Sequence, residues 1–198
     1  MSSQEWNRIK TQYTDGRNKI KHSRFAVVGT SCSGKTTISK AISEKLGIKY
    51  VEIDSIYWLP DWQKRPDKGL FCIIDKATLE DAWVTDGSYS RLHNYTLNRA
   101  DVIVWLNYSF PLVFLRALRR TIKRSITQEE LFAGCRESWY ESFCTRNSIL
   151  WWVITTFKKR RDQYRKIFNE KIFGDKTYVE LHSQREADRF LREIKFCK

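Results

Sequence analysis

The segment from Gly29 to Thr36 constrains the fold of this chain more than any other. Its sequence, GTSCSGKT, matches every fixed position of the pattern GxxxxGK[ST], also called Walker A, which is typical of phosphate-binding loops between a strand and a helix. A short apolar run, residues 25–28, precedes it, and residues 35–46 follow with apolar side chains at helical spacing before Gly47. A chance match in a glycine-containing turn would lack these flanking elements, so we predict nucleotide binding.

The fixed residues of this loop each have a chemical role. Glycines let successive backbone N–H groups point at the β-phosphate, Lys35 reaches the β- and γ-phosphate oxygens, and the Thr36 hydroxyl is a ligand for Mg²⁺. We therefore expect ATP and Mg²⁺ as cofactors. The residues expected to contact the nucleotide are Gly29, Thr30, Ser31, Cys32, Ser33, Gly34, Lys35, Thr36 and Thr37.

Apolar runs after the loop continue the alternation of strands and helices. We predict strands over residues 49–53, 82–86, 101–106 and 177–181, and helices over residues 110–124, 148–168 and 184–194. The run over 101–106 is almost continuously apolar, as in a parallel strand that helices cover on both faces. The predicted fold class is α/β, with a doubly wound parallel sheet of about five strands.

The length and composition fit one domain. At 198 residues with 41% hydrophobic residues, the chain is long enough for one sizeable core and short for two. We predict a P-loop domain over residues 24–196, after a basic N-terminal extension over residues 1–23. No apolar run is long enough for a membrane span and the first twenty residues lack a signal-peptide pattern, so we expect a cytoplasmic protein with no membrane partner.

Charge and cysteine content narrow the class of partner. The net charge of +13 favours polyanions, which include nucleotides, nucleic acid and acidic surfaces. Five cysteines without a CxxC pair are typical of reduced thiols, and three scattered histidines do not indicate a metal site.

Two aspartates follow predicted strands at the edge where open α/β sheets bind ligands. Asp54 is a candidate catalytic base that accepts the proton of the phosphoryl acceptor, or a ligand to a Mg²⁺-bound water; the alternative is a helix or turn cap. Asp86, followed by Gly87, is a candidate catalytic and metal-side carboxylate; the alternative is a turn-forming Asp-Gly pair.

Aromatic side chains cluster after the second strand. Tyr57, Trp58, Pro60 and Trp62 either form one wall of an acceptor pocket or a small apolar cluster beneath a loop.

Basic residues at helical spacing form a second group. Arg116, Arg119, Arg120, Lys123 and Arg124 share one helix face, and we expect Leu118 and Ile122 on the opposite one. Guanidinium groups stabilise the charge of a transferring phosphoryl group. We therefore assign Arg116 and Arg120 to phosphate and leave the others solvated. The basic run 158–161 is assigned to solvent or RNA.

Several segments together resemble the topology modulation proteins, which are P-loop proteins related to adenylate kinase. The resemblance covers about residues 24–191 and rests on the phosphate loop and the segments 53–62, 83–91, 99–106, 116–120, 134–137 and 150–152. It implies a nucleoside-monophosphate-kinase fold with a helical lid insertion over roughly residues 116–147, and places Arg116, Arg120 and Arg136 near that lid. The resemblance implies an aspartate at position 107, where this chain has Asn107. Asp86 is then the remaining candidate carboxylate on the metal side.

The leading functional hypothesis is an ATP-dependent phosphotransferase, a kinase that acts on a small-molecule acceptor such as a nucleotide or nucleoside. The alternative is a nucleic-acid-associated P-loop NTPase that affects DNA topology or gene regulation, with the +13 charge in its favour. A non-catalytic nucleotide-binding module is the third hypothesis.

Overall fold

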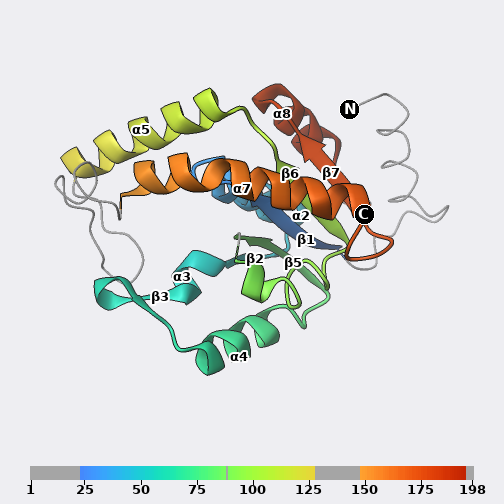
Figure 1. Cartoon of the computed structure of the whole chain (residues 1–198). Coiled ribbons are helices and arrows are strands. Elements are labelled where there is room, and N and C mark those ends of the chain that lie inside the picture. Colours follow the sequence, from blue (N-terminus) through green and yellow to red (C-terminus); the bar gives the residue numbers. More distant parts are fainter. Residues whose placement is uncertain (1–22, 88, 128–147, 195–198) are drawn as a thin grey trace.

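The structure is a computed structural model that describes residues 23–87, 89–127 and 148–194. Its centre is a parallel five-stranded sheet in the order β2-β5-β1-β6-β7 (Figure 1). Its strands are β1 Ser23–Gly29, β2 Lys49–Glu52, β5 Ala82–Asp86, β6 Val102–Leu106 and β7 Thr177–Leu181. The predicted number of strands and the doubly wound α/β class are confirmed. Residues 1–22 of the predicted extension, residues 128–147 of the predicted lid, and Arg136 lie outside the described residues.

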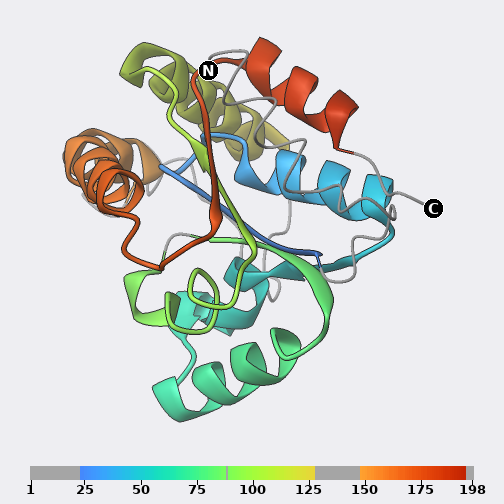
Figure 2. The ribbon, with the colours of Figure 1, turned by 90° about the vertical axis from the view of Figure 1, so that its right-hand side faces the viewer.

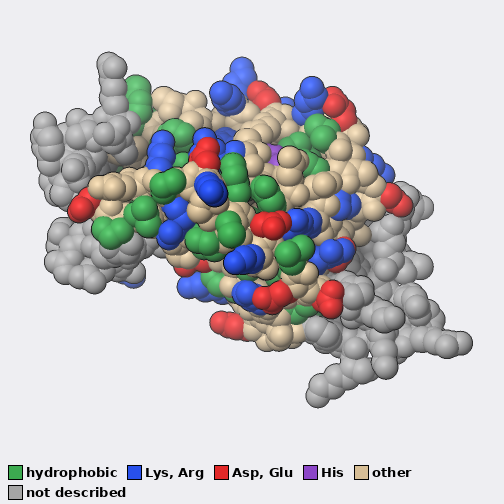
Figure 3. Space-filling view, turned by 90° about the horizontal axis from the view of Figure 1, so that it is seen from below, with side chains coloured by type: hydrophobic (Ala, Val, Ile, Leu, Met, Phe, Trp, Pro, Cys, Tyr) green, Lys and Arg blue, Asp and Glu red, His purple; other side chains and the backbone are tan. Residues whose placement is uncertain are grey.

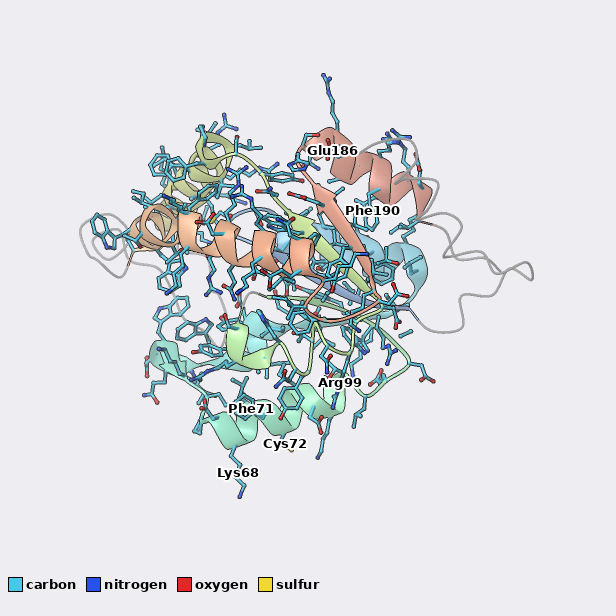
Figure 4. The ribbon with its side chains drawn as sticks, turned by 45° about the vertical axis from the view of Figure 1, so that its right-hand side comes forward. Lys68, Phe71, Cys72, Arg99, Glu186 and Phe190 are labelled. Carbon is cyan, nitrogen blue, oxygen red and sulfur yellow. The ribbon has the colours of Figure 1, made fainter. Side chains whose placement is uncertain are left out.

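Helices cover both faces of this sheet. They are α2 Lys35–Leu46, α5 Phe110–Thr127, α7 Ile149–Glu170 and α8 Gln184–Glu193. Figure 2 shows α7 on one side of the sheet, with α2 and α8 on the other. Two buried clusters lie between the helices and the sheet. One joins α2, α5, α8 and the first half of α7 to the sheet, and the other joins the second half of α7 to it. Figure 4 shows Phe190 of α8 turned toward the sheet.

A third buried cluster lies within the segment that links β2 to β5. It joins α3 Ile53–Tyr57 to α4 Asp67–Ala77 through Ile53, Leu70 and Ile74. Between these helices runs a short hairpin of β3 Trp58–Leu59 and β4 Gln63–Lys64, with a 3₁₀ turn at Pro60–Trp62. This small subdomain lies beyond the carboxyl ends of β2 and β5.

One local prediction was wrong, and the buried face of α5 was not predicted. β2 ends at Glu52, because Ile53 begins α3, so Asp54 lies in the first turn of a helix instead of closing the strand. On α5 the buried residues are Val113, Ala117, Thr121 and Ser125, while Ile122 is 39% exposed. A row of mainly small residues at i, i+4 spacing lets α5 approach its neighbours closely, and this packing places Leu118 and Ile122 off the buried face.

Among the described residues, no helix combines the length and the apolar character that crossing a membrane requires.

Candidate active site

The loop from Gly29 to Gly34 joins the end of β1 to the start of α2. Ser33 N donates to Thr30 O over 3.3 Å, and Cys32 and Gly34 hold left-handed φ values of 60° and 97°. Gly34 caps α2 without a side-chain hydrogen bond, so the first N–H groups of that helix are oriented for an anion. A Cβ on Gly29 would lie 2.8 Å from Ser33 Oγ, which is why this position requires glycine.

Lys35 turns back over the loop that precedes it. Its ammonium donates to Thr30 O over 2.9 Å. Burial lowers the pKa of Lys35, and the negative charges of Asp54 and Asp86 oppose that shift. The two predicted carboxylates therefore act on the same ammonium, although Asp54 lies in α3 and Asp86 ends β5.

Thr36 and Asp86 form the direct contact between α2 and β5. Thr36 Oγ1 donates to Asp86 Oδ2 over 2.5 Å. Asp86 is only 4% exposed, and its Oδ1 is buried without a hydrogen-bond partner among the described residues. Hydroxyl and carboxylate oxygens are the ligand types that Mg²⁺ prefers, together with water and nucleotide phosphates. The donor set and the unpartnered oxygen fit that ion.

Two residues of β2 surround Asp86 on the sheet face that α2 covers. Glu52 is the register partner of Asp86. Burial raises the pKa of both carboxyl groups, and Asp54 adds to each shift. Burial together with the charges of Asp86 and Glu52 raises the pKa of Tyr50. The edge of the sheet beside the loop is thus acidic and partly desolvated.

Asp54 is anchored from a second segment. Tyr89, which follows β5, donates from its hydroxyl to Asp54 Oδ1 over 2.6 Å. Its ring stacks on Tyr57, with centroids 4.3 Å apart. Burial, and then the charge of Asp54, raises the pKa of Tyr89, so that hydroxyl stays a donor. Gly87 permits this approach, because a Cβ there would lie 2.9 Å from Ile53 Cδ1.

Two arginines of α5 reach the loop from the opposite side. Arg116 donates from Nη1 to Ser33 O over 2.9 Å and from Nη2 to Gln184 Oε1 over 2.8 Å, and its guanidinium lies 4.9 Å from the ring centroid of Tyr108. Arg120 Nη1 lies 3.9 Å from Cys32 Sγ. Both predicted arginines therefore contact the loop, and Arg116 is held mainly at its outer flank.

A cavity of about 190 Å³ opens beside this flank. Its lining residues come from the loop, α2, α5, the segment after β6 and the start of α8: Ser33, Gly34, Thr37, Ile38, Tyr108, Arg116 and Gln184. The Tyr108 hydroxyl is buried without a hydrogen-bond partner in the described part of the chain. The cavity is small, has both polar and apolar residues in its wall, and is continuous with the phosphate loop.

The site contains residues that the sequence did not single out for a role. Tyr50, Tyr108 and Gln184 follow no motif, and Tyr89 entered only as part of a resemblance. Two of them are tied to partners across the fold: Gln184 lies 68 residues from Arg116, and Tyr89 lies 35 residues from Asp54. Asn107 Nδ2 donates to Glu180 Oε1 over 2.6 Å, so its side chain is engaged away from the loop.

The fold and the loop define the class: a P-loop α/β protein whose ligand edge is formed by the carboxyl ends of parallel strands. No protein-family model matches the sequence. The shikimate kinase from Acinetobacter baumannii, solved in complex with shikimate, is 16% identical, with a TM-score of 0.55 over 87% of this chain and 90% of that chain. The fold is therefore like that of shikimate kinase.

Two gluconokinases are also similar. One from Sinorhizobium meliloti 1021 is 18% identical, with a TM-score of 0.49 over 87% of this chain and 93% of that chain. A protein described as "Probable gluconokinase" from Schizosaccharomyces pombe (strain 972 / ATCC 24843) is 54% identical over 33 residues. That match spans 17% of this chain and 17% of the relative.

Proposed function

We propose that this protein is an ATP-dependent kinase that transfers the γ-phosphoryl group to a hydroxyl of a small molecule. The observation that carries the proposal is the arrangement at one edge of the sheet, where Thr36 donates to Asp86 and Lys35 turns back over the phosphate loop. Phosphoryl transfer needs positioning and charge stabilisation more than covalent chemistry, and this set offers both. The likeness to shikimate kinase and to gluconokinases supports the same class.

Each residue has a role in this proposal. The loop amides and Lys35 hold the β- and γ-phosphates, Thr36 and Asp86 hold Mg²⁺, and Asp54 accepts the acceptor's proton. Magnesium, when bound, neutralises phosphate charge. Arg120 faces the phosphates across Cys32, and Arg116 with the cavity at Tyr108 and Gln184 holds the nucleoside part of ATP.

The finer assignment, to the topology modulation proteins and to an effect on DNA, rests on the sequence resemblance and on the charge of +13. The surface gives it less support. On α7, Arg165 pairs with Asp162 over 3.3 Å, and Lys166 lies 4.0 Å from Glu170. Figure 3 shows a face of the molecule on which basic, acidic and apolar side chains are interspersed. We therefore prefer the kinase over the nucleic-acid-associated NTPase.

The test is an assay of ADP release with Mg²⁺-ATP and a panel of hydroxyl compounds, on the unaltered protein and on Lys35→Ala. We expect acceptor-stimulated turnover that falls at least about 100-fold in Lys35→Ala. The matched control is Lys68→Ala, since Lys68 points away from the body of the protein (Figure 4). Equal turnover in Lys35→Ala would overturn the proposal.

A titration of labelled duplex DNA at two salt concentrations tests the alternative. Tight binding that responds to ATP and falls steeply with salt, without any acceptor-stimulated turnover, would favour the nucleic-acid-associated NTPase.

A further inference from the structure

A continuous chain of aromatic rings leads from Asp54 to the surface. The Tyr89 ring, hydrogen-bonded to Asp54, stacks on Tyr57, with an angle of 27° between the ring planes. Trp58 packs edge-on against Tyr57 at 4.9 Å, and Trp62 packs edge-on against Trp58 at 5.6 Å. Tyr57 is 7% exposed and Trp62 is 37% exposed. The outer rings therefore present flat apolar surface at the far end of a chain of ring contacts that begins at the candidate catalytic carboxylate.

The turn that carries the outermost ring is strained. Asp61 and Trp62 hold left-handed φ values of 56° and 54°, which are rare for any residue with a side chain and rarer for a bulky one. Such a conformation costs about 1–3 kcal/mol per residue and is concentrated at ligand-binding positions. The hairpin pairing of Trp58 with Lys64 holds the turn. The folded state therefore tolerates this backbone strain, and the strained turn fixes the orientation of Trp62.

The arginines of this subdomain and its surroundings are engaged in structural contacts. Arg65 Nε donates to Ile56 O over 2.7 Å. Arg91 pairs with Asp67 over 2.7 Å, and Arg99 pairs with Asp75 over 2.6 Å. Recognition of a carboxylate or phosphate on an acceptor typically uses a guanidinium fork. The described arginines here instead make contacts within the protein that hold the subdomain together.

The chemistry of Asp54 limits the acceptor further. A hydroxyl acceptor must lose its proton as it attacks, which a nearby carboxylate can accept. A phosphate acceptor is already ionised and needs no base, and the negative charge of Asp54 repels it. Tyr89 occupies Oδ1, which leaves Oδ2 for the acceptor.

We propose that the acceptor is an uncharged compound that carries a flat heteroaromatic ring and a free hydroxyl group, as a nucleoside does. This inference rests on the proposed kinase function. The ring packs on Trp58 and Trp62, and the hydroxyl lies at Asp54. In the transfer, the acceptor oxygen forms a bond to the γ-phosphorus and its proton goes to Asp54. The bond from the γ-phosphorus to the β,γ-bridging oxygen breaks, and ADP leaves.

The experiment measures binding and turnover separately. Binding is measured by titration calorimetry, with a non-hydrolysable ATP analogue and Mg²⁺ present, for four probes: adenosine, thymidine, gluconate and shikimate. Turnover is measured with ATP for the same probes and for AMP. We expect a nucleoside to bind and to be phosphorylated, gluconate and shikimate to bind at least tenfold more weakly, and AMP to be turned over at least tenfold more slowly.

Two variants locate the ring. Trp62→Ala should weaken nucleoside binding roughly 5- to 100-fold, the range expected for loss of one base–aromatic stacking contact, and leave binding of the ATP analogue unchanged. The matched control is Trp152→Ala, which removes a similarly exposed tryptophan, 48% exposed on α7. Trp62→Phe should recover part of the affinity, because a smaller flat ring remains.

Each outcome decides the inference. Preferred binding of gluconate or shikimate, binding of none of the probes, or nucleoside affinity that Trp62→Ala leaves unchanged would overturn it. Lys35-dependent phosphorylation of gluconate or shikimate alone would overturn the inference and leave the proposed kinase function intact. Nucleoside binding that depends on Trp62, without turnover of any acceptor, would support the ring site and contradict the kinase function.

Discussion

The close approach of Gly87 to Ile53 predicts a large effect of a side chain at position 87 on the stability of the protein. A Cβ at Gly87 would meet Ile53 at Cδ1, 2.9 Å away, and at Cβ, 3.1 Å away. Overpacking of this kind costs about 1–3 kcal/mol, and the φ of 156°, which residues with side chains seldom adopt, adds about 1–3 kcal/mol. We therefore expect Gly87→Ala to lower the free energy of unfolding by about 2–6 kcal/mol. For a chain of this size, that lowers Tm by roughly 5–20 °C.

The functional effect should exceed what lost stability alone explains. Ile53 precedes Asp54 in α3, so displacing Ile53 displaces the carboxylate, and a misplacement of about 1 Å costs on the order of 100-fold in rate. We expect kcat to fall by that order at a temperature where the variant is fully folded. ADP affinity measured without metal should stay within about twofold, since the phosphate loop is not moved.

Two further variants give the measurement its control. Gly69→Ala, inside α4 with its nearest neighbour atoms at 3.9 Å, should stabilise the protein by about 0.5–1 kcal/mol. Ile53→Ala combined with Gly87→Ala should be less damaging than the two single changes added together, because it removes the clash. Thermal unfolding and steady-state kinetics check both expectations. Additive effects in this cycle, or an unchanged kcat in Gly87→Ala, would refute the reasoning.

The remaining predictions concern the two carboxylates. Asp86→Asn should stop Mg²⁺-dependent turnover yet stabilise the protein without ligand at pH 7. Burial raises the folded-state pKa of Asp86 above its ordinary value of 3.8, so the stability this group contributes is present below that value and is lost as pH rises through the folded pKa. Unfolding at pH 4 and pH 7 checks this, and an equal effect at both would contradict it. Asp54→Asn should lower kcat about 100- to 10,000-fold with ATP affinity preserved; a collapse of ATP affinity would instead assign Asp54 to the metal.

The parts of the site that the sequence predicted are those encoded in a short stretch of chain. The loop, α2 and its end at Gly47 follow from local patterns, and Gly47 does adopt a left-handed conformation with φ 60°. Asp86 was predicted because a carboxylate at the carboxyl end of a parallel strand lies at the edge of the sheet where open α/β proteins bind ligands.

What the sequence did not reveal depends on contacts between distant segments. The role of Tyr89 appears only when the loop after β5 meets α3, and Gly87 permits that approach. The inward face of α5 was not predicted, because hydrophobicity does not mark it: close helix packing selected small residues such as Ala117. Helix spacing grouped Arg116 with Arg120, but only the position of Gln184 after β7 shows that Arg116 is held at the outer flank.

The helix α2 belongs to the ligand site at one end and to the buried core along its length. Ile38 lines the cavity and packs in the same cluster as Ile42, which is fully buried. Side chains in a close-packed interior transmit strain to their neighbours, so a truncation at Ile42 will loosen the loop to which we assign phosphate binding. A mutational scan scored by activity alone will therefore mark Ile42 as functionally essential, although Ile42 does not line the cavity. Separating ligand chemistry from core packing along this helix requires abundance and activity to be scored in parallel.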